Sequence, residues 1–163
     1  MVILIYFVTP GFNMDSLSIN LEWKLDNDVF SPGKYSTYHT IKINDKININ
    51  ADSASSYGGN VDNMNPEQSL AASLSSCHMM TFLALASKFK WPVKNYKDKA
   101  IAHLGKNSDG KMSVTKIELN PQVLFSDDFK VSEDDMSKMQ DRSHRYCFIA
   151  NSLSKEVEIM INL

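Results

Sequence analysis

The chain contains 163 residues, of which 43% are hydrophobic and 22% are charged, a length and composition that predict one folded domain and exclude an intrinsically disordered chain. The near balance of 17 basic and 19 acidic residues, with a formal net charge of −2, gives no electrostatic support for binding to nucleic acid or an anionic membrane. Two cysteines are too few for a disulfide framework or a four-thiolate zinc site, but they can form one redox pair.

The first twelve residues, MVILIYFVTPGF, differ from the rest of the chain. The run from Met1 to Val8 is apolar, but it lacks the basic segment and the cleavage site of a signal peptide, and it is shorter than the about 20 residues of a membrane span. We interpret residues 1–13 as an extension or as a start assigned upstream of Met14, and we expect residues 1–163 to form a single domain. Without an export signal we predict a cytoplasmic location, where thiols stay reduced outside catalysis.

Three antiparallel strands are predicted before the first helix, at residues 17–25, 35–43 and 47–51. Each alternates with the period of two that is typical of half-buried strands, and in the second strand one face carries Tyr35, Thr37, His39, Ile41 and Ile43. Pro32-Gly33 predicts a turn between the first two strands, and Asn44-Asp45 predicts a hairpin between the second and the third. Residues 53–63 are rich in Ser, Gly and Asn and predict a loop.

The clearest local signal is a helix that begins after Asn65. Asn65 is a favourable N-cap, Pro66 suits the first helical position, and Gln68 completes a capping box. The helical pattern continues to Lys90, where a Trp-Pro pair ends it. Since apolar residues lie on several faces, we expect a central, buried helix with Cys77 on its apolar stripe.

The remaining elements are two strands, a second helix and a final strand. The strands are predicted at residues 96–104, 112–119 (with 121–125 as an extension) and 157–161. Ser132 is the predicted N-cap of the second helix, whose first turn carries three acidic residues that suit the helix dipole. The order β-β-β-α-β-β-α-β predicts the α+β fold class, with hairpins rather than alternating crossovers.

Cys77 and Cys147 carry the most reactive side chains, and each also has a purely structural interpretation. A cysteine on the apolar stripe of a helix is most often a small core residue, and burial makes its thiol inert. Reactivity requires a nearby cation and a hydrogen-bond network, and the helix dipole does not help Cys77 in the middle of a helix. Spacing alone does not pair the two cysteines, so both interpretations stay open on the residue pattern.

Two Cys/His pairs, Cys77-His78 and His144-x-x-Cys147, suggest a zinc site. Adjacent helical residues point about 100° apart and do not easily share one ion, and structural zinc sites prefer two chelating pairs. The chain also lacks a glycine-rich phosphate loop and the G-x-S-x-G and H-E-x-x-H motifs. We therefore expect neither a metal nor a cofactor.

The start of the predicted first helix resembles the OsmC/Ohr family, the osmotically inducible and organic-hydroperoxide-resistance proteins. The segment from Asn65 to Cys77 reads NPEQSLAASLSSC. In that family the helix opens with Asn-Pro-Glu, and the reactive cysteine lies ten residues after the glutamate. Cys77 follows Glu67 with the same offset.

A second segment, HRYCFIANSL from His144 onwards, is similar to the family's His-x-x-Cys-x-x-x-Asn motif around its second cysteine. Asn151 falls at the expected place, although Phe148 stands where the family usually has proline. The order of strands and helices also agrees, so the resemblance covers residues 17–163 and implies a divergent OsmC-like branch. By this resemblance His144 is a supporting residue of the site.

The resemblance implies an OsmC-like fold in which antiparallel sheets from two chains wrap two central helices, giving an intertwined homodimer with active sites at the interface. It also implies a thiol-dependent peroxidase that reduces organic hydroperoxides. Cys77 would be the peroxidatic thiolate, which becomes a sulfenic acid, and Cys147 would resolve it as a disulfide. A thiol or dithiol reductant would close the cycle, and Glu67 would help to hold the reactive geometry. No nucleic acid or membrane is expected as a partner.

One residue of the family's site has no counterpart in the chain. Ohr-type members supply an arginine from the amino-terminal strands to stabilise the thiolate, whereas Arg142 and Arg145, the only arginines here, both follow Cys77. His39 and Lys34 are the candidate replacements, although neither offers a bidentate fork and His39 also suits an ordinary strand position. This departure keeps an alternative open, namely a non-catalytic small-molecule-binding or redox-sensing dimer with weak or no peroxide turnover.

Overall fold

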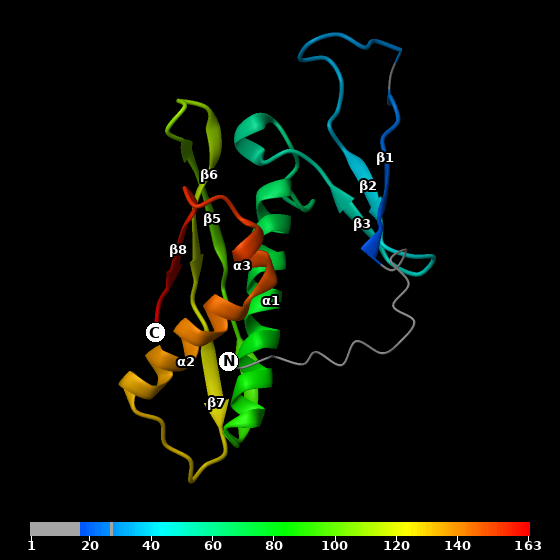
Figure 1. Ribbon diagram of the computed structural model, residues 1–163. Helices are drawn as coiled ribbons and strands as arrows, with labels where there is room; N and C mark the ends of the chain where they lie inside the picture. The colour runs from blue at the N-terminus through cyan, green and yellow to red at the C-terminus, as the bar shows by residue number, and fades with distance from the viewer. Residues whose placement is uncertain (1–16, 27) are drawn as a thin grey trace. The chain divides into compact units, whose positions relative to one another are not determined.

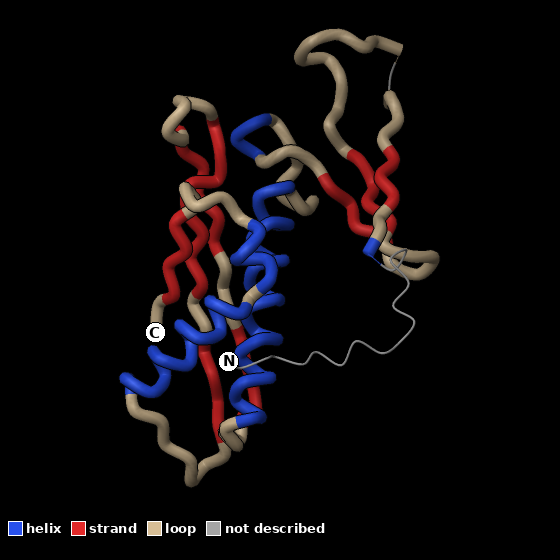
Figure 2. The backbone as a smooth tube through the Cα atoms, viewed as in Figure 1, coloured by secondary structure: helices blue, strands red, loops and turns tan. Residues whose placement is uncertain are grey.

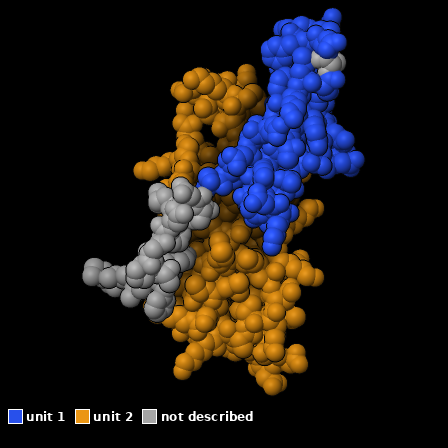
Figure 3. Space-filling model, turned by 90° about the vertical axis from the view of Figure 1, so that its right-hand side faces the viewer, with its two compact units in different colours: residues 1–64 blue, residues 65–163 orange. Residues whose placement is uncertain are grey.

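The computed structural model describes residues 17–26 and 28–163, which form two compact units (Figure 1). Unit 1 lies within Met1–Met64, and unit 2 comprises Asn65–Leu163 (Figure 3). The predicted extension at residues 1–13 lies outside the described residues. The expectation of a single domain stays a prediction.

Unit 1 contains a three-stranded antiparallel sheet in the order β1–β2–β3. Its strands are β1 (Asn20–Glu22), β2 (His39–Lys42) and β3 (Asn48–Ala51). All three predicted strands are present but are shorter than predicted. The pairing between β1 and β2 covers three positions, and the pairing between β2 and β3 covers four. Leu21 lies opposite Ile41, and Ile41 lies opposite Ile49, so one face of the sheet carries an apolar row. The predicted loop contains a short 3-10 helix, η2 (Ser55–Tyr57).

Helix α1 (Pro66–Lys88) opens unit 2 with the predicted capping box. Asn65 Oδ1 accepts the Gln68 N–H at 2.8 Å, and Gln68 Oε1 accepts the Asn65 N–H at 3.0 Å. The helix ends in a Schellman motif, in which Lys90 has a positive φ of 60° and the Trp91 N–H donates to the Ala86 carbonyl at 2.8 Å. Its buried residues are Ala71, Leu74, Cys77, His78, Thr81, Phe82, Leu85 and Ala86.

The other side of α1 is exposed in the described part of the chain. Met80 is 54% exposed and Leu83 is 36% exposed, so the expected burial on several faces holds for one side only. Helix α1 has the length and hydropathy of a membrane span, properties that it shares with the core helices of water-soluble proteins. It packs against three strands and two helices of unit 2, as a core helix does.

Unit 2 contains five strands in two sheets. They are β4 (Val93–Lys97), β5 (Ile101–Lys106), β6 (Met112–Leu119), β7 (Gln122–Phe125) and β8 (Glu158–Ile161). Strand β4 pairs with β7 and β5 pairs with β6, both antiparallel, whereas β6 pairs with β8 in parallel. The last pairing is a crossover that hairpin patterns do not predict, because it joins strands far apart in the sequence.

The predicted strand at residues 96–104 is interrupted at Asp98. Asp98 Oδ1 accepts the Asn120 N–H at 2.6 Å, and its Oδ2 accepts the Ser75 hydroxyl of α1 at 2.5 Å. Pro121 breaks the opposite side of the same hairpin because it has no N–H to donate. Residues 122–125 therefore form a separate strand, β7, that pairs with β4.

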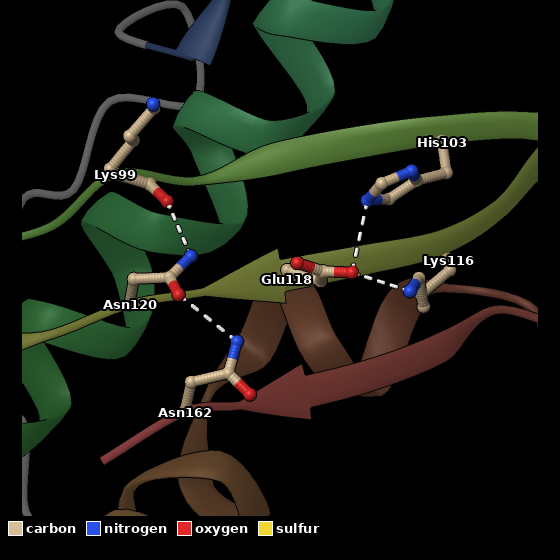
Figure 4. A network of polar contacts seen from close by, with 6 residues as sticks. All are labelled: Lys99, His103, Lys116, Glu118, Asn120 and Asn162. Atoms are coloured by element: carbon tan, nitrogen blue, oxygen red, sulfur yellow. Dashed lines mark hydrogen bonds and ion pairs between the residues drawn. The ribbon is translucent and has the colours of Figure 1, made fainter.

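A polar network covers the face of the β5–β6–β8 sheet opposite the core (Figure 4). Glu118 pairs with His103 at 3.1 Å and with Lys116, and Asn162 Nδ2 donates to Asn120 Oδ1 at 3.0 Å. Side chains alternate between the two faces of a strand, and the neighbours of Glu118 in β6 are fully buried. His103 is therefore not part of the core that contains the cysteines.

Two further helices complete unit 2 (Figure 2). Helix α2 (Glu133–Tyr146) has the predicted N-cap, since Ser132 Oγ accepts the Asp135 N–H at 3.1 Å. Helix α3 (Phe148–Ser152) was not predicted, because five residues are too few for a helical period to be recognised. The observed mixture of sheets and helices confirms the α+β fold class.

Candidate active site

Cys77 and Cys147 lie in one buried cluster of unit 2. Cys77 is 9% exposed, Cys147 is fully buried, and both are free thiols. The cluster also contains Leu74, Ile117 and Leu119. Cys77 contributes to the raised pKa of the Cys147 thiol, so the two side chains lie near each other. The fold thus brings together two thiols that sequence spacing does not pair.

Cys147 occupies the junction between α2 and α3. Its N–H donates to the His144 carbonyl at 3.2 Å, and its Sγ accepts the Ala150 N–H at 3.4 Å as the N-cap of α3. The backbone of Cys147 is extended, with φ −73° and ψ 116°, and this ends α2 before α3 begins. Local backbone geometry therefore helps to fix the Cys147 sulfur.

Burial raises the pKa of the Cys147 thiol to about 11, and the nearby Cys77 acts in the same direction, while the Ala150 N–H opposes it. Cys147 therefore keeps its proton at neutral pH. Cys77 is the more exposed of the two cysteines.

Glu67 lies in the first turn of α1, ten residues before Cys77. Ten helical residues rise about 15 Å, so the carboxylate and the sulfur do not touch. Glu67 Oε2 is buried and has no hydrogen-bond partner within residues 17–26 and 28–163. The position near the helix start is favourable for a negative charge. An effect of Glu67 on the sulfur therefore has to pass through another group.

His39 and Lys34 belong to unit 1. His39 is the first residue of β2, and its Nδ1 bonds to the Thr37 carbonyl at 2.8 Å. Because a carbonyl only accepts, Nδ1 carries the proton and Nε2 presents a lone pair when the ring is neutral. Lys34 follows the Pro32-Gly33 turn, where its N–H donates to Ser31. The roles of His39 and Lys34 toward Cys77 stay predictions.

An aromatic pocket of unit 1 was not predicted from the sequence. It has a volume of about 330 Å³ and is lined by Leu21, Trp23, Phe30, Tyr35, Thr37 and His39. Its three aromatic rings pack together, with centroids 5.0 Å apart for Phe30 and Tyr35 and 5.8 Å apart for Trp23 and Phe30. A pocket of this size and lining suits the apolar part of a small molecule.

Comparison with known proteins decides the family. A family model described as OsmC-like protein matches residues 58–162. The chain belongs to the OsmC-like protein family. The two segments that indicated this family, around Glu67 and Cys147, lie within the matched range. A comparison with curated proteins finds no match.

Solved structures agree with this assignment. An OsmC-like protein of unknown function from Vibrio cholerae is 39% identical, with a TM-score of 0.81 over 89% of this chain and 97% of that one. An organic hydroperoxide resistance protein from Elizabethkingia anophelis is 16% identical, with a TM-score of 0.66 over 88% and 93%. The organic hydroperoxide resistance protein OhrB of Bacillus subtilis is 14% identical, with a TM-score of 0.63 over 90% and 96%. The last two likenesses concern the fold alone, and the predicted OsmC-like fold is confirmed.

A second group of polar residues lies in the interior of this OsmC-like chain, and sequence analysis did not predict it. His78 is fully buried, and its Nε2 bonds to Gln140 Oε1 at 2.7 Å, which joins α1 to α2. Among the buried atoms that have no hydrogen-bond partner in the described part of the chain are His78 Nδ1, His144 Nδ1 and Tyr96 Oη. Within that part, no group of three or more His, Cys, Asp and Glu side chains could hold a metal ion.

Burial lowers the pKa of His78, and nearby His144 lowers it further, whereas the hydrogen bond to Gln140 and the charge of Asp98 oppose the change. Burial also raises the pKa of Tyr96, with a smaller contribution from Asp98. Both groups therefore stay neutral at physiological pH. The single signal for His78 in the sequence is its position next to a cysteine on the apolar stripe of α1.

Acid should destabilise the parent protein more than the variant His78→Gln. Because the pKa of folded His78 lies below the about 6.5 of an unfolded histidine, the unfolded state binds more protons, and the free energy of unfolding falls as the pH drops through this value. One proton limits this slope to about 1.4 kcal/mol per pH unit. Urea unfolding at several pH values, from neutral to mildly acidic, measures it.

His78→Gln is the matched control because glutamine keeps an N–H donor for Gln140 but does not titrate. We expect its unfolding free energy to lose the part of the pH dependence that His78 contributes. Equal slopes in the two proteins would show that His78 is not the buried group that acid must charge.

Proposed function

We propose that the protein is a thiol-dependent peroxidase that reduces organic hydroperoxides, with Cys77 as the peroxidatic residue and Cys147 as the resolving residue. The observation that carries the proposal is the placement of the two free thiols in one buried cluster. Membership of the OsmC-like family, whose fold is shared with organic hydroperoxide resistance proteins, supports the same reaction.

The reaction has two oxidative steps. The Cys77 thiolate attacks the terminal oxygen of the hydroperoxide, the O–O bond breaks, and the alkoxide leaves as an alcohol after it takes a proton. Cys77 is then a sulfenic acid. The Cys147 thiol loses its proton and attacks the Cys77 sulfur, and the hydroxide that leaves combines with a proton to form water. A thiol or dithiol reductant then reduces the disulfide in the cytoplasm, where we propose the protein acts.

Glu67, His144, His39 and Lys34 are the proposed supporting residues. The buried Glu67 Oε2, which has no hydrogen-bond partner among the described residues, is suited to hold a donor or cation that orders the site. His39 and Lys34 are candidates for the cationic role that arginine has in Ohr-type proteins. Replacing each in turn by glutamine and measuring the rate of Cys77 oxidation separates these roles, since a residue that acts on the thiolate changes that rate.

Mixing the reduced protein with cumene hydroperoxide tests the reaction. We expect two thiols per chain to disappear and one intramolecular Cys77–Cys147 disulfide to form, as measured by thiol titration and peptide mass spectrometry. In Cys147→Ser, one thiol should disappear and a dimedone-reactive sulfenic acid should accumulate. Thiols that stay reduced in the parent protein would exclude the peroxidase.

We also propose that the protein is a homodimer. Exposed apolar side chains include Met80 of α1 at 54%, Leu21 of β1 at 59% and Ile47, which directly precedes β3, at 50%. Apolar surface of this kind is typical of an association surface.

Met80→Lys should weaken the dimer because it places a charge on the exposed apolar side of α1. We expect the parent protein to sediment as a dimer at micromolar concentration and Met80→Lys to sediment partly or wholly as a monomer. Lys97→Glu, which changes an exposed residue of β4, is the control and should stay dimeric. A parent protein that sediments as a monomer would refute the dimer.

A second candidate function is the binding of an apolar or aromatic small molecule without peroxide turnover. The aromatic pocket of unit 1 and the absence of arginine before Cys77 favour it. It predicts unreactive thiols together with a melting temperature that rises with ligand concentration. If the protein instead is a redox sensor, Cys77 is oxidised stoichiometrically without turnover in the presence of a dithiol.

A further inference from the structure

His78 joins the helix that carries Cys77 to the helix that precedes Cys147. It directly follows Cys77 in α1, and its Nε2 bonds to Gln140 of α2 at 2.7 Å. Cys147 follows Gln140 by seven residues, or about two helical turns, so both lie toward the same side of α2. The hydrogen bond and the cysteine pair thus connect the same two parts of unit 2.

The hydrogen bond between His78 and Gln140 fixes the orientation of α2 relative to α1, because a hydrogen bond depends on direction and apolar packing does not. His78 and Gln140 are 0% and 2% exposed, so the bond is shielded from solvent. Gln140 Nε2 contacts Met136 Sδ at 3.8 Å, which leaves Oε1 to accept the His78 N–H. The hydroxyl of buried Ser143 donates within its own helix, to the Met139 carbonyl at 2.8 Å, and does not reach α1.

Loss of this bond would leave a buried donor or acceptor without a partner, a state that proteins avoid. Helix α2 would then shift until the freed group reached water or a new partner. Cys147 is at the carboxyl end of α2, so such a shift would move its sulfur relative to Cys77. Two thiols form a disulfide only within a narrow range of separations and angles.

We propose that His78, held by Gln140, is a positioning residue for the resolving half of the reaction. This inference rests on the proposed function. In the step concerned, the Cys147 thiol gives up its proton, its sulfur bonds to the Cys77 sulfur, and the S–O bond of the sulfenic acid breaks to release water. His78 takes no part in these bonds. It keeps the two sulfurs at a separation and angle that allow the disulfide to form.

Single-turnover mixing with cumene hydroperoxide separates the two oxidative steps. In His78→Leu and in Gln140→Leu, sulfenic acid should form at the parental rate, while the disulfide should form at least about tenfold more slowly. Since the two residues share one interaction, the double variant should be little slower than either single variant. His78→Gln keeps the donor and should restore the disulfide rate.

Phe82→Leu is the control for a general loss of stability, since Phe82 is a fully buried residue of α1 that packs on Trp91 and Tyr96. It should lower the melting temperature without slowing the disulfide step. The proposal is wrong if His78→Leu forms the disulfide as fast as Phe82→Leu, or if His78→Leu slows both oxidative steps equally.

A glutathione redox buffer tests the positioning without peroxide. The parent protein and His78→Gln should form the Cys77–Cys147 disulfide at the same ratio of oxidised to reduced glutathione, and His78→Leu should require a ratio at least about tenfold more oxidising. If the protein does not react with the hydroperoxide but forms the disulfide in the glutathione buffer, the proposed peroxidase activity is refuted. The glutathione measurement then still tests the positioning role of His78. Equal ratios, or a parent protein that forms no disulfide in the buffer, would overturn the positioning role.

Discussion

Cys77→Ser should lower the rate of hydroperoxide reduction at least about 1,000-fold, equivalent to about 4 kcal/mol of activation free energy. The reason is that the thiolate is the proposed nucleophile, and a serine hydroxyl is not ionised at neutral pH. Serine is close to cysteine in size, so the buried cluster around Leu74 and Ile117 should be retained. An assay with dithiothreitol as the reductant measures the rate, and thiol titration shows whether Cys147 stays reduced.

Cys147→Ser is the matched control, because it removes the other buried thiol. It should keep the first oxidation at the parental rate and form no intramolecular disulfide, so that continued turnover depends on direct reduction of the sulfenic acid by the external thiol. A Cys77→Ser protein that reduces hydroperoxide as fast as the parent would exclude Cys77 as the nucleophile and would favour the small-molecule-binding alternative.

Asp98→Ala should lower the free energy of unfolding by about 3 kcal/mol. Asp98 accepts one hydrogen bond from the Asn120 N–H and one from the Ser75 hydroxyl, and alanine leaves both donors without this partner. The effect is large because the same carboxylate anchors the break between β4 and β5 to α1. Urea unfolding followed by circular dichroism measures the change.

Asp109→Ala is the control for removing an acidic side chain from an exposed turn, and it should change the unfolding free energy by less than about 0.5 kcal/mol. Asp98→Asn should give an intermediate loss, because the amide keeps one acceptor oxygen. If Asp98→Ala is no less stable than Asp109→Ala, the break between β4 and β5 is held by other contacts.

Helix starts and strand positions could be predicted from the sequence where neighbouring residues determine them. The start of α1 was predicted because Asn65, Pro66 and Gln68 satisfy each other within one turn, and the structure shows those bonds. The start of α2 at Ser132 follows the same logic. Alternating apolar residues located the strands of unit 1, although pairing sets their ends.

Elements that depend on distant residues could not be predicted in this way. The interruption at Asp98 depends on Ser75 and Asn120, which lie more than twenty residues away. The parallel pairing of β8 with β6 and the hydrogen bond between His78 and Gln140 are likewise tertiary contacts. No periodicity or propensity encodes them.

The same distinction between local signals and tertiary contacts applies to the residues of the candidate site. Cys77, Glu67 and Cys147 were singled out because two segments resemble a family, whereas composition and spacing left each cysteine open to a structural interpretation. The placement of both thiols in one buried cluster came from the fold. The buried polar group around His78 was missed because a histidine within an apolar stripe has no distinctive pattern of its own.

The position of Cys147 makes one atom serve two purposes. Its sulfur accepts the Ala150 N–H and so caps a helix of five residues, and the same sulfur is the proposed partner of Cys77. The proposed bond to Cys77 would change the electron density and direction of that sulfur, and with it the hydrogen bond to the first turn of α3. We therefore expect the chemical shift of the Ala150 amide proton to report the redox state of the cysteine pair.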